Sequence, residues 1–181
     1  MVDAESYRAQ ETLPDGRALL IRAQRPDDRE AYLAALKRTS PETLYRRFFV
    51  PKRGFSEEEA HHFLDIDYVT QVALVADVEE NGKPALVGGA RYIVTRPGQA
   101  EVSFTVIDAY QGLGIGSRLL HHLARIGEQA GVEEFIAEVL ADNAPMLRVF
   151  ERSGLHPRKT RSGAVVDVTM RLPLESADVD G

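Results

Sequence analysis

The chain contains no cysteine and has no long apolar run. The lack of cysteine excludes disulfides, thiolate metal ligands and a cysteine nucleophile. No segment approaches the roughly 18 consecutive apolar residues that a membrane-spanning helix needs, and the polar first ten residues lack the apolar core of a signal peptide. We therefore expect a cytoplasmic protein with no membrane partner.

An excess of positive charge is also absent. The 28 acidic residues outnumber the 22 lysines and arginines, which gives a net charge of −6. Nucleic acids attract cationic surfaces, so this balance argues against a nucleic-acid partner. Internal repeats and low-complexity linkers are absent too. We expect one domain over residues 16–174, with polar tails at 1–15 and 175–181.

Helical and strand periodicities alternate along the chain. The pattern predicts helices over residues 25–39, 41–49, 56–66, 115–131 and 143–154, and strands over 16–24, 70–80, 84–95, 99–108, 132–140 and 163–172. Ser56 and Glu59 have the spacing of a capping box at the start of the third helix. The three strands between residues 70 and 108 are joined by short turns, which indicates an antiparallel meander. The fold class is therefore α/β, with helices packed on a central sheet.

The segment YQGLGIGSRLL, residues 110–120, places three glycines directly before a predicted helix. The first turn of a helix has unpaired amides and about half a positive charge, so it binds phosphate groups. Glycines let the backbone approach such an anion closely. The dinucleotide fingerprint needs a glycine where Ser117 stands, and the Gly-Lys-Ser/Thr ending of a P-loop is absent. A simple tight turn is the alternative interpretation.

Residues 111–116, QGLGIG, match the Gln/Arg-x-x-Gly-x-Gly/Ala signature of the GCN5-related N-acetyltransferases (GNAT family). The resemblance covers residues 16–172 and is strongest over 99–156, which have that family's order of strand, loop, helix, strand and Asn-led helix. The chain is most similar to the domains that acetylate protein lysines, and we expect a stand-alone version of them. Segments 39–49, 100–106 and 138–155 carry this closer likeness. The resemblance implies the GNAT fold, with a mixed, largely antiparallel sheet of about six to seven strands and flanking helices.

This resemblance implies an N-acetyltransferase that uses acetyl-CoA and no metal. The amides of residues 111–117 would hold the pyrophosphate, and the pantetheine arm would lie where strand 99–108 splays from strand 132–140. The N–H of Val106 or Ile107 would polarise the thioester carbonyl. Asn143 fits both a contact with the CoA arm and a plain helix cap. The implied cofactor-binding residues are Val106, Ile107, Gln111, Gly112, Leu113, Gly114, Ile115, Gly116, Ser117 and Asn143.

Glu101 is the candidate general base, because a glutamate in the matching context has that role in the lysine-modifying relatives. It shares one strand face with Ser103 and Thr105. A lysine amine has a pKa of about 10.4, so a base is needed to deprotonate it at neutral pH. A solvated glutamate at the strand edge is the alternative. Phe150 stands where many relatives carry a tyrosine that protonates the leaving thiolate, and Tyr110 is interpreted as a packing residue rather than its substitute.

No metal site is expected, because the adjacent histidines at 61–62 and 121–122 point about 100° apart on their helices. The arginines and aromatic residues of segment 45–49 are interpreted as a helix face near the acceptor groove. Asp65 and Asp67 are candidates for lining an amine site.

The identity of the acceptor stays open between a protein lysine and a small polyamine-like or antibiotic-like amine. A domain that binds acyl-CoA as a sensor or scaffold, without catalysis, is the alternative function. A nicotinamide-dinucleotide enzyme would need a fingerprint that the sequence lacks. Dimers are common among such folds, and the C-terminal strand is the expected contact of a homodimer.

Overall fold

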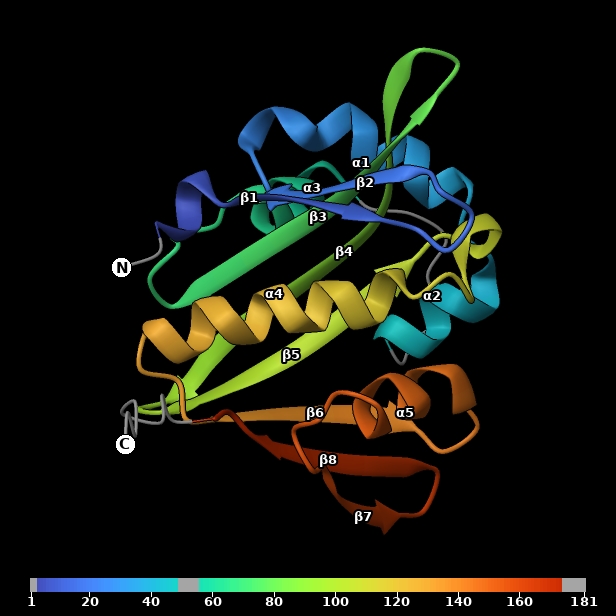
Figure 1. Cartoon of the computed structure of the whole chain (residues 1–181). Helices are drawn as coiled ribbons and strands as arrows, with labels where there is room; N and C mark the ends of the chain where they lie inside the picture. The colour runs from blue at the N-terminus through green and yellow to red at the C-terminus, as the bar shows by residue number, and fades with distance from the viewer. Residues whose placement is uncertain (1–2, 49–55, 174–181) are drawn as a thin grey trace, which may run out of the picture.

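A mixed sheet runs through the computed structural model, which describes residues 3–48 and 56–173. Within those residues the sheet has eight strands, in the order β1-β2-β3-β4-β5-β6-β8-β7 (Figure 1). The pair β5 and β6 is parallel, and the other neighbouring pairs are antiparallel. The strands are β1 (Arg8–Thr12), β2 (Ala18–Ala23), β3 (Gln71–Glu80), β4 (Lys83–Arg96), β5 (Gln99–Val106), β6 (Glu134–Leu140), β7 (Arg158–Ser162) and β8 (Val165–Arg171).

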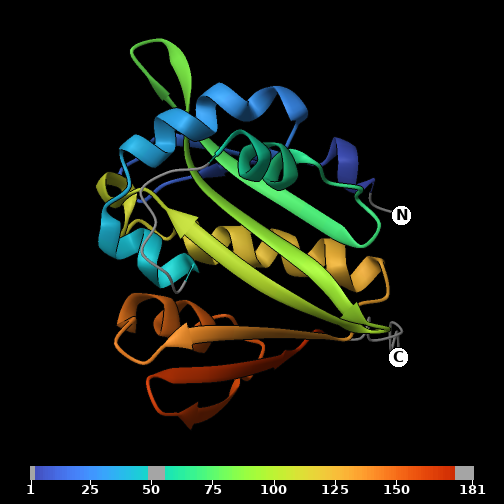
Figure 2. The same ribbon diagram turned by 180° about the vertical axis from the view of Figure 1, so that it is seen from behind.

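Helices cover both faces of the sheet. The α-helices of the described residues are α1 (Arg29–Lys37), α2 (Pro41–Phe48), α3 (Glu57–Leu64), α4 (Ile115–Gln129) and α5 (Ala144–Glu151). Helix α4 lies across β3, β4 and β5 on one face, while α1 and α3 lie on the other, as the front and back views show (Figures 1 and 2). This arrangement leaves α2 and α5 at the end of the sheet where β5 finishes.

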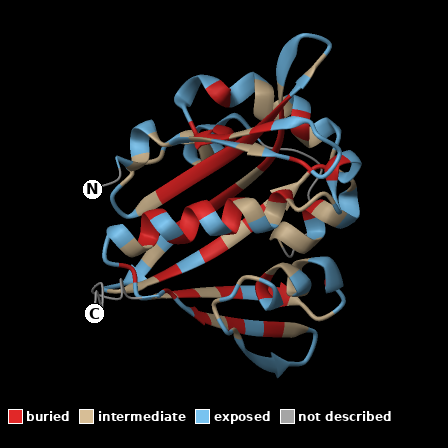
Figure 3. Ribbon diagram, in the orientation of Figure 1, coloured by how far each residue is buried: buried red, intermediate tan, exposed pale blue. Residues whose placement is uncertain are grey.

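The apolar stripe of α4 makes the main contact with the sheet. Leu119, Leu120, Leu123 and Ile126 are almost completely buried, and they recur at helical spacing. They face a central strand, β3, that is buried along most of its length (Figure 3). The amphipathic helix predicted for residues 115–131 is therefore confirmed, and its start is fixed beside the glycine-rich loop.

Most predicted elements are confirmed, including the antiparallel meander of β3, β4 and β5 and the capping box at Ser56. Two strands were missed. Strand β1 lies inside the segment 1–15 that was expected to be a tail, and β7 consists of five exposed residues. Both are polar edge strands without apolar alternation, so no pattern marked them. Segment 175–181, the expected C-terminal tail, lies outside the described residues.

Strands β5 and β6 pair over three positions and then separate. Gln99, Ala100 and Glu101 of β5 pair with Glu134, Phe135 and Ile136 of β6. Beyond Glu101 the strands diverge, and the gap widens toward the glycine-rich loop (Figure 1). The splay between these two strands that the sequence predicted is therefore present.

In the described part of the chain, no helix combines the length and the apolar character that crossing a membrane requires.

Candidate active site

The glycine-rich loop between β5 and α4 has the backbone conformation that only glycine adopts easily. Gly112 and Gly114 both have φ of +81°. Gly114 is the N-cap of α4 and offers no side chain to its first turn. By contrast, Ser56 and Asn143 accept hydrogen bonds from the first turns of α3 and α5. The amides at the start of α4 therefore keep their unpaired donors for a ligand.

A cavity of about 450 Å³ opens between the diverging strands and the loop. Strand β5 contributes residues 102–106 and β6 contributes residues 137–139. The predicted cofactor-binding residues that line it are Val106, Gln111, Gly112, Gly114, Ile115, Gly116, Ser117 and Asn143. Leu113 does not line it, because this side chain packs partly buried against the hydrophobic core. The structure therefore gathers most of the predicted residues around one hollow.

The backbone N–H groups of Val106 and Ile107, the two candidates for contacting the thioester carbonyl, point in opposite directions. The N–H of Ile107 donates a 2.9 Å hydrogen bond to the carbonyl of Val87 in β4, so it is already used. Because successive amides of a strand alternate between its two neighbours, the N–H of Val106 points toward the gap. The carbonyl of Val106 accepts a 3.0 Å bond from Gln111 Nε2. Of the two alternatives, the Ile107 amide is already used within the sheet, and the Val106 amide is the one that faces the cavity.

Positive charge dominates the rim of the cavity. Arg46 and Arg47 come from α2, and Arg148 and Arg152 come from α5 and its end. Among the described residues that line it, Glu138 is the only carboxylate. The chain is acidic as a whole, so this local excess of guanidinium groups marks the site as one for an anionic ligand.

The Asn-led helix presents a cap and an aromatic ring to the cavity. Asn143 is buried, and its Oδ1 accepts a bond from the Met146 amide at 3.3 Å, so its capping role is present. Phe150 is 1% exposed and packs edge-on against Phe104, with ring centroids 5.8 Å apart. A hydroxyl group is therefore missing from this position, as the sequence indicated.

Tyr110 does not supply the missing hydroxyl. Its ring is buried, and its hydroxyl donates a 2.6 Å hydrogen bond to Glu80 and accepts one from Arg17. The interpretation of Tyr110 as a packing residue is therefore supported by its surroundings, although its ring also touches the cavity.

Glu101 is exposed and stands at the last paired position of β5 and β6. Ser103, two residues further along the same strand face, lines the cavity, which puts Glu101 about 7 Å from that wall. The negative charge of Glu101 acts on Arg47 and favours its protonated form. Glu101 therefore lies where the gap between β5 and β6 begins, and it lines neither cavity.

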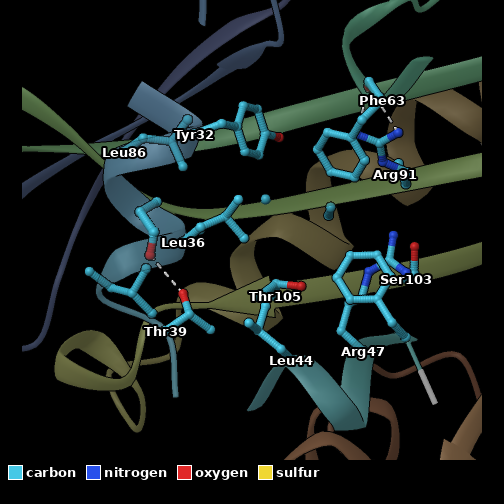
Figure 4. A pocket seen from close by; sticks show the side chains of 16 residues that line it. Tyr32, Leu36, Thr39, Leu44, Arg47, Phe63, Leu86, Arg91, Ser103 and Thr105 are labelled. Atoms are coloured by element: carbon cyan, nitrogen blue, oxygen red, sulfur yellow. Dashed lines mark hydrogen bonds between the residues drawn. The ribbon is translucent and has the colours of Figure 1, made fainter. Parts of the chain in front are cut away.

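A second, smaller cavity of about 50 Å³ lies on the other face of β5, under α1 and α2. Leucines occupy one part of it, and Arg47, Arg91 and Ser103 gather at the other (Figure 4). Arg47, Ser103 and Thr105 line both hollows. The two cavities are therefore adjacent, with β5 between them.

The other candidates of the sequence have structural roles. Asp67 accepts bonds from the amides of Val69, Thr70 and Gln71 and from the Thr70 hydroxyl, which closes a turn. Neither Asp65 nor Asp67 lines either cavity. His122 is buried between Tyr7 and Glu11. Within residues 3–48 and 56–173 there is no cluster of three or more metal-ligating side chains.

Comparison with known proteins places this fold and site in one class. Residues 39–155 match the model of the Acetyltransferase (GNAT) family, and the chain belongs to that family. It is therefore an acyltransferase. An acetyltransferase of Pseudomonas aeruginosa is 36% identical over 137 residues, which cover 75% of this chain and 74% of that protein.

Two further relatives carry the name Pat. The acetyltransferase Pat of Mycolicibacterium smegmatis is 36% identical over 146 residues, and the match spans 77% of this chain but only 41% of that longer protein. The crystal structure of the GNAT domain of S. lividans PAT is 33% identical, with a TM-score of 0.82 over 91% of this chain and 97% of that domain. The expected closer likeness to Pat-like domains is therefore confirmed.

Three arginines that line the cavities were not predicted from the sequence: Arg91 of β4, and Arg148 and Arg152 at the end of α5. Arg91 interrupts an otherwise apolar strand, and an arginine in such a run is a signal for a buried charged site. Arg148, in the last turn of α5, and Arg152, its C-cap, are four residues apart at the opposite end from the Asn143 cap, so the sequence places them on one helix face. The two arginines of α2 were expected near the acceptor groove, and they do line the cavities.

Proposed function

We propose that this protein is an N-acetyltransferase that moves an acetyl group from acetyl-CoA to a primary amine. The observation that carries the proposal is the large cavity, which joins an uncapped, glycine-rich helix start to a gap between two strands. A pyrophosphate suits the helix start, and a long, narrow arm suits the gap. A solved structure from Salmonella typhimurium with this fold (20% identity, TM-score 0.63) is described with its cofactor acetyl-CoA.

The residues present fit the parts of CoA. The amides of Gly112 to Ser117 would hold the pyrophosphate, and Arg148 and Arg152 add positive charge at the rim. The exposed amide edge of β5 would hydrogen-bond the pantetheine arm in the gap, where β6 no longer pairs with it. When bound, acetyl-CoA supplies the acetyl group as a thioester.

The Val106 amide would stabilise the charge that develops on the thioester oxygen. Two hydrogen bonds fix its orientation: the carbonyl of Val106 accepts one from Gln111, and the amide of Ile107 donates one to Val87 in β4. A donor that is fixed before the reaction needs no reorganisation during it. The reaction forms a C–N bond and breaks a C–S bond.

Glu101 would accept the proton that the amine releases. It lies about two residues from the wall shared by the two cavities, so one water molecule or a small movement of its side chain connects it to an amine there. The aromatic side chain of Phe150 offers no proton to the leaving sulfur, which would therefore depart as a thiolate or take its proton from another group. A positioned base contributes about 10²–10⁴-fold to such a reaction.

Calorimetric titration with acetyl-CoA tests the binding half of the proposal. Gly112→Glu places a carboxylate in the loop, and Gly131→Glu is the matched control at the far end of α4. Both glycines have positive φ, +81° and +89°, and a Cβ at either meets no atom within 4 Å. Loss of binding in Gly112→Glu alone supports the site. Equal binding in both variants would overturn it.

Turnover tests the catalytic half and separates an enzyme from a sensor. Glu101→Gln should bind acetyl-CoA like the wild type while its rate of thiol release falls by about 10²–10⁴-fold. If the wild type binds acetyl-CoA tightly but acetylates no amine in a broad screen, the domain is a sensor and the enzymatic proposal fails.

A further inference from the structure

The small cavity contains two arginines without carboxylate partners. In the described residues, no acidic side chain lies within ion-pair distance of Arg47 or Arg91. The protein pairs its other buried arginine differently, because Arg22 bonds to both Asp28 and Asp77 at 2.8–2.9 Å. Arg91 is buried and Arg47 is half-buried. Buried guanidinium groups are normally paired, so the walls of this cavity favour an anionic ligand.

Arg91 is held rigidly by neutral groups. Its Nη1 and Nη2 atoms donate to the carbonyl of Phe63 at 3.2 Å, and Nη2 also donates to Gln24 Oε1 at 3.2 Å. The guanidinium lies 3.5 Å from the centroid of the Phe63 ring. These contacts fix the position of the charge without neutralising it. A fixed guanidinium loses little entropy when it binds a carboxylate.

Arg47 faces the same end of the cavity from α2, next to Ser103 (Figure 4). Its guanidinium forms no hydrogen bond with any described side chain or carbonyl, and its contact is with the neighbouring Phe48 ring. Burial and the nearby Arg91 lower the pKa of Arg47 to about 10. The two positive charges therefore repel each other, and an anion between them would remove that cost.

The opposite end of the cavity is apolar. Leu36, Leu44 and Leu86 line it, and the space is small, about 50 Å³. A ligand that fills the whole chamber therefore has a compact aliphatic group and an anionic group. Because Ser103 and Thr105 line both cavities, such a ligand would direct its third group past these two residues toward the gap between β5 and β6.

We propose that the acceptor is an amino acid with a short aliphatic side chain, whose carboxylate is held by Arg47 and Arg91. This inference rests on the proposed acetyl transfer and names its substrate class. Planar, paired contacts from guanidinium groups match a carboxylate. The same positive charges lower the pKa of an adjacent ammonium group, which assists its loss of a proton. They disfavour a polyamine, which brings further positive charge.

Matched acceptors test the carboxylate directly. We would measure acetyl-CoA-dependent thiol release with L-leucine, L-leucinamide and 3-methylbutylamine, which differ in the group attached beside the amine. L-Leucine should have a kcat/KM about 10–100-fold above that of the other two, the range that a charged hydrogen bond provides. Equal or better turnover of the amide, a lysine peptide or spermidine would overturn the inference and leave the acetyltransferase proposal intact.

Substitutions in α2 and α1 test whether Arg47 is the side chain that binds the carboxylate. Arg47 also lines the large cavity, so both substrates should be affected, but Arg47→Gln should lower kcat/KM for L-leucine about 10–100-fold more than that for L-leucinamide. Arg47→Lys should restore part of the loss. Lys37→Gln removes one charge from the exposed end of α1, outside both cavities, and should change neither substrate. Equal losses for both substrates in Arg47→Gln would contradict carboxylate recognition.

Binding of the acetylated products tests carboxylate recognition without requiring turnover. N-acetyl-L-leucine should bind the wild-type protein in calorimetry about 10–100-fold more tightly than N-acetyl-L-leucinamide, and Arg47→Gln should abolish that difference. If this preference appears while no amine is acetylated, the carboxylate site stands and the proposed transferase activity fails. If both compounds bind equally, the site is not one for a carboxylate.

Discussion

Gln111 holds the carbonyl of Val106 through a 3.0 Å hydrogen bond from its side-chain amide, and the same nitrogen lies 3.3 Å from the Thr43 hydroxyl. One side chain thus connects the end of β5, the glycine-rich loop and α2. The signature residue of the loop therefore orients the strand that faces the cavity, rather than facing the ligand alone.

Replacement of Gln111 should weaken acetyl-CoA binding in a fixed order. Gln111→Leu loses the donor to Val106, and a net hydrogen bond of about 0.5–1.5 kcal/mol corresponds to a roughly 2–12-fold weaker Kd. Gln111→Glu loses the same donor and adds negative charge near the phosphate-binding amides, so its Kd should rise further. Calorimetry checks the order, and equal affinities in all three proteins would show that the contact is dispensable.

Arg22 should be essential for stability. It pairs with Asp28 and Asp77 in a buried network, where each side chain is less than a tenth exposed. Arg22→Met leaves two buried carboxylates without their cation and should lower the free energy of unfolding by about 3–5 kcal/mol. Arg29→Met is the control, because its pair with Glu57 is exposed and such pairs contribute under about 1 kcal/mol. Urea unfolding of both variants measures the contrast.

Asp67 should make stability depend on pH in the acid range. Bonds from the Thr70 hydroxyl and from the amides of the turn lower the pKa of Asp67 to about 2, below its ordinary value of 3.8. Its contribution is therefore complete above the unfolded pKa and disappears as the pH falls through the folded one.

Urea unfolding of Asp67→Asn at several pH values tests this dependence. At pH 7 the variant should be about 1 kcal/mol less stable, the usual effect of losing such a cap. The difference should shrink steadily as the pH falls from about 4 toward 2. Thr70→Val should show a smaller loss over the same range. A difference that stays constant with pH would mean that the charge of Asp67 is irrelevant.

Two glycines of α4 should respond oppositely to added side chains. At Gly127 a Cβ would stand 3.1 Å from the Phe135 ring, so Gly127→Val should cost about 1–3 kcal/mol of unfolding free energy. At Gly116 a Cβ would meet Val149 at an ordinary 3.5 Å, and Gly116→Ala should keep or raise stability by up to ~1 kcal/mol. Thermal unfolding distinguishes them, and similar losses at both positions would contradict the packing described.

The fold could be predicted from sequence to the extent that its elements are amphipathic. Helix α4 and the meander have strong periodic patterns, whereas β1 and β7 are polar edges whose pairing depends on neighbours distant in the chain. The loop glycines were recognisable because positive φ demands that residue type. The direction of each amide was not recognisable, since it depends on the register of β5 against β4, which decided between Val106 and Ile107.

The small cavity shows the same limit. Arg47 and Arg91 are 44 positions apart in the sequence, and their charges meet in one cavity only because α2 packs on the sheet that contains β4. No local pattern reports that an arginine lacks a partner. That property depends on every carboxylate in the folded molecule.

The short ladder between β5 and β6 has a mechanical consequence. Three paired positions are the only strand-to-strand connection that the described residues provide between β1–β5 and the unit of β6, β7 and β8. The sheet is therefore weakest at its middle, and the C-terminal unit should open there as a block before the rest unfolds. A ligand that occupies the gap would bridge both blocks, so amide hydrogen exchange in β6 and β8 should slow when it binds and should report occupancy from strands that the cofactor loop never touches.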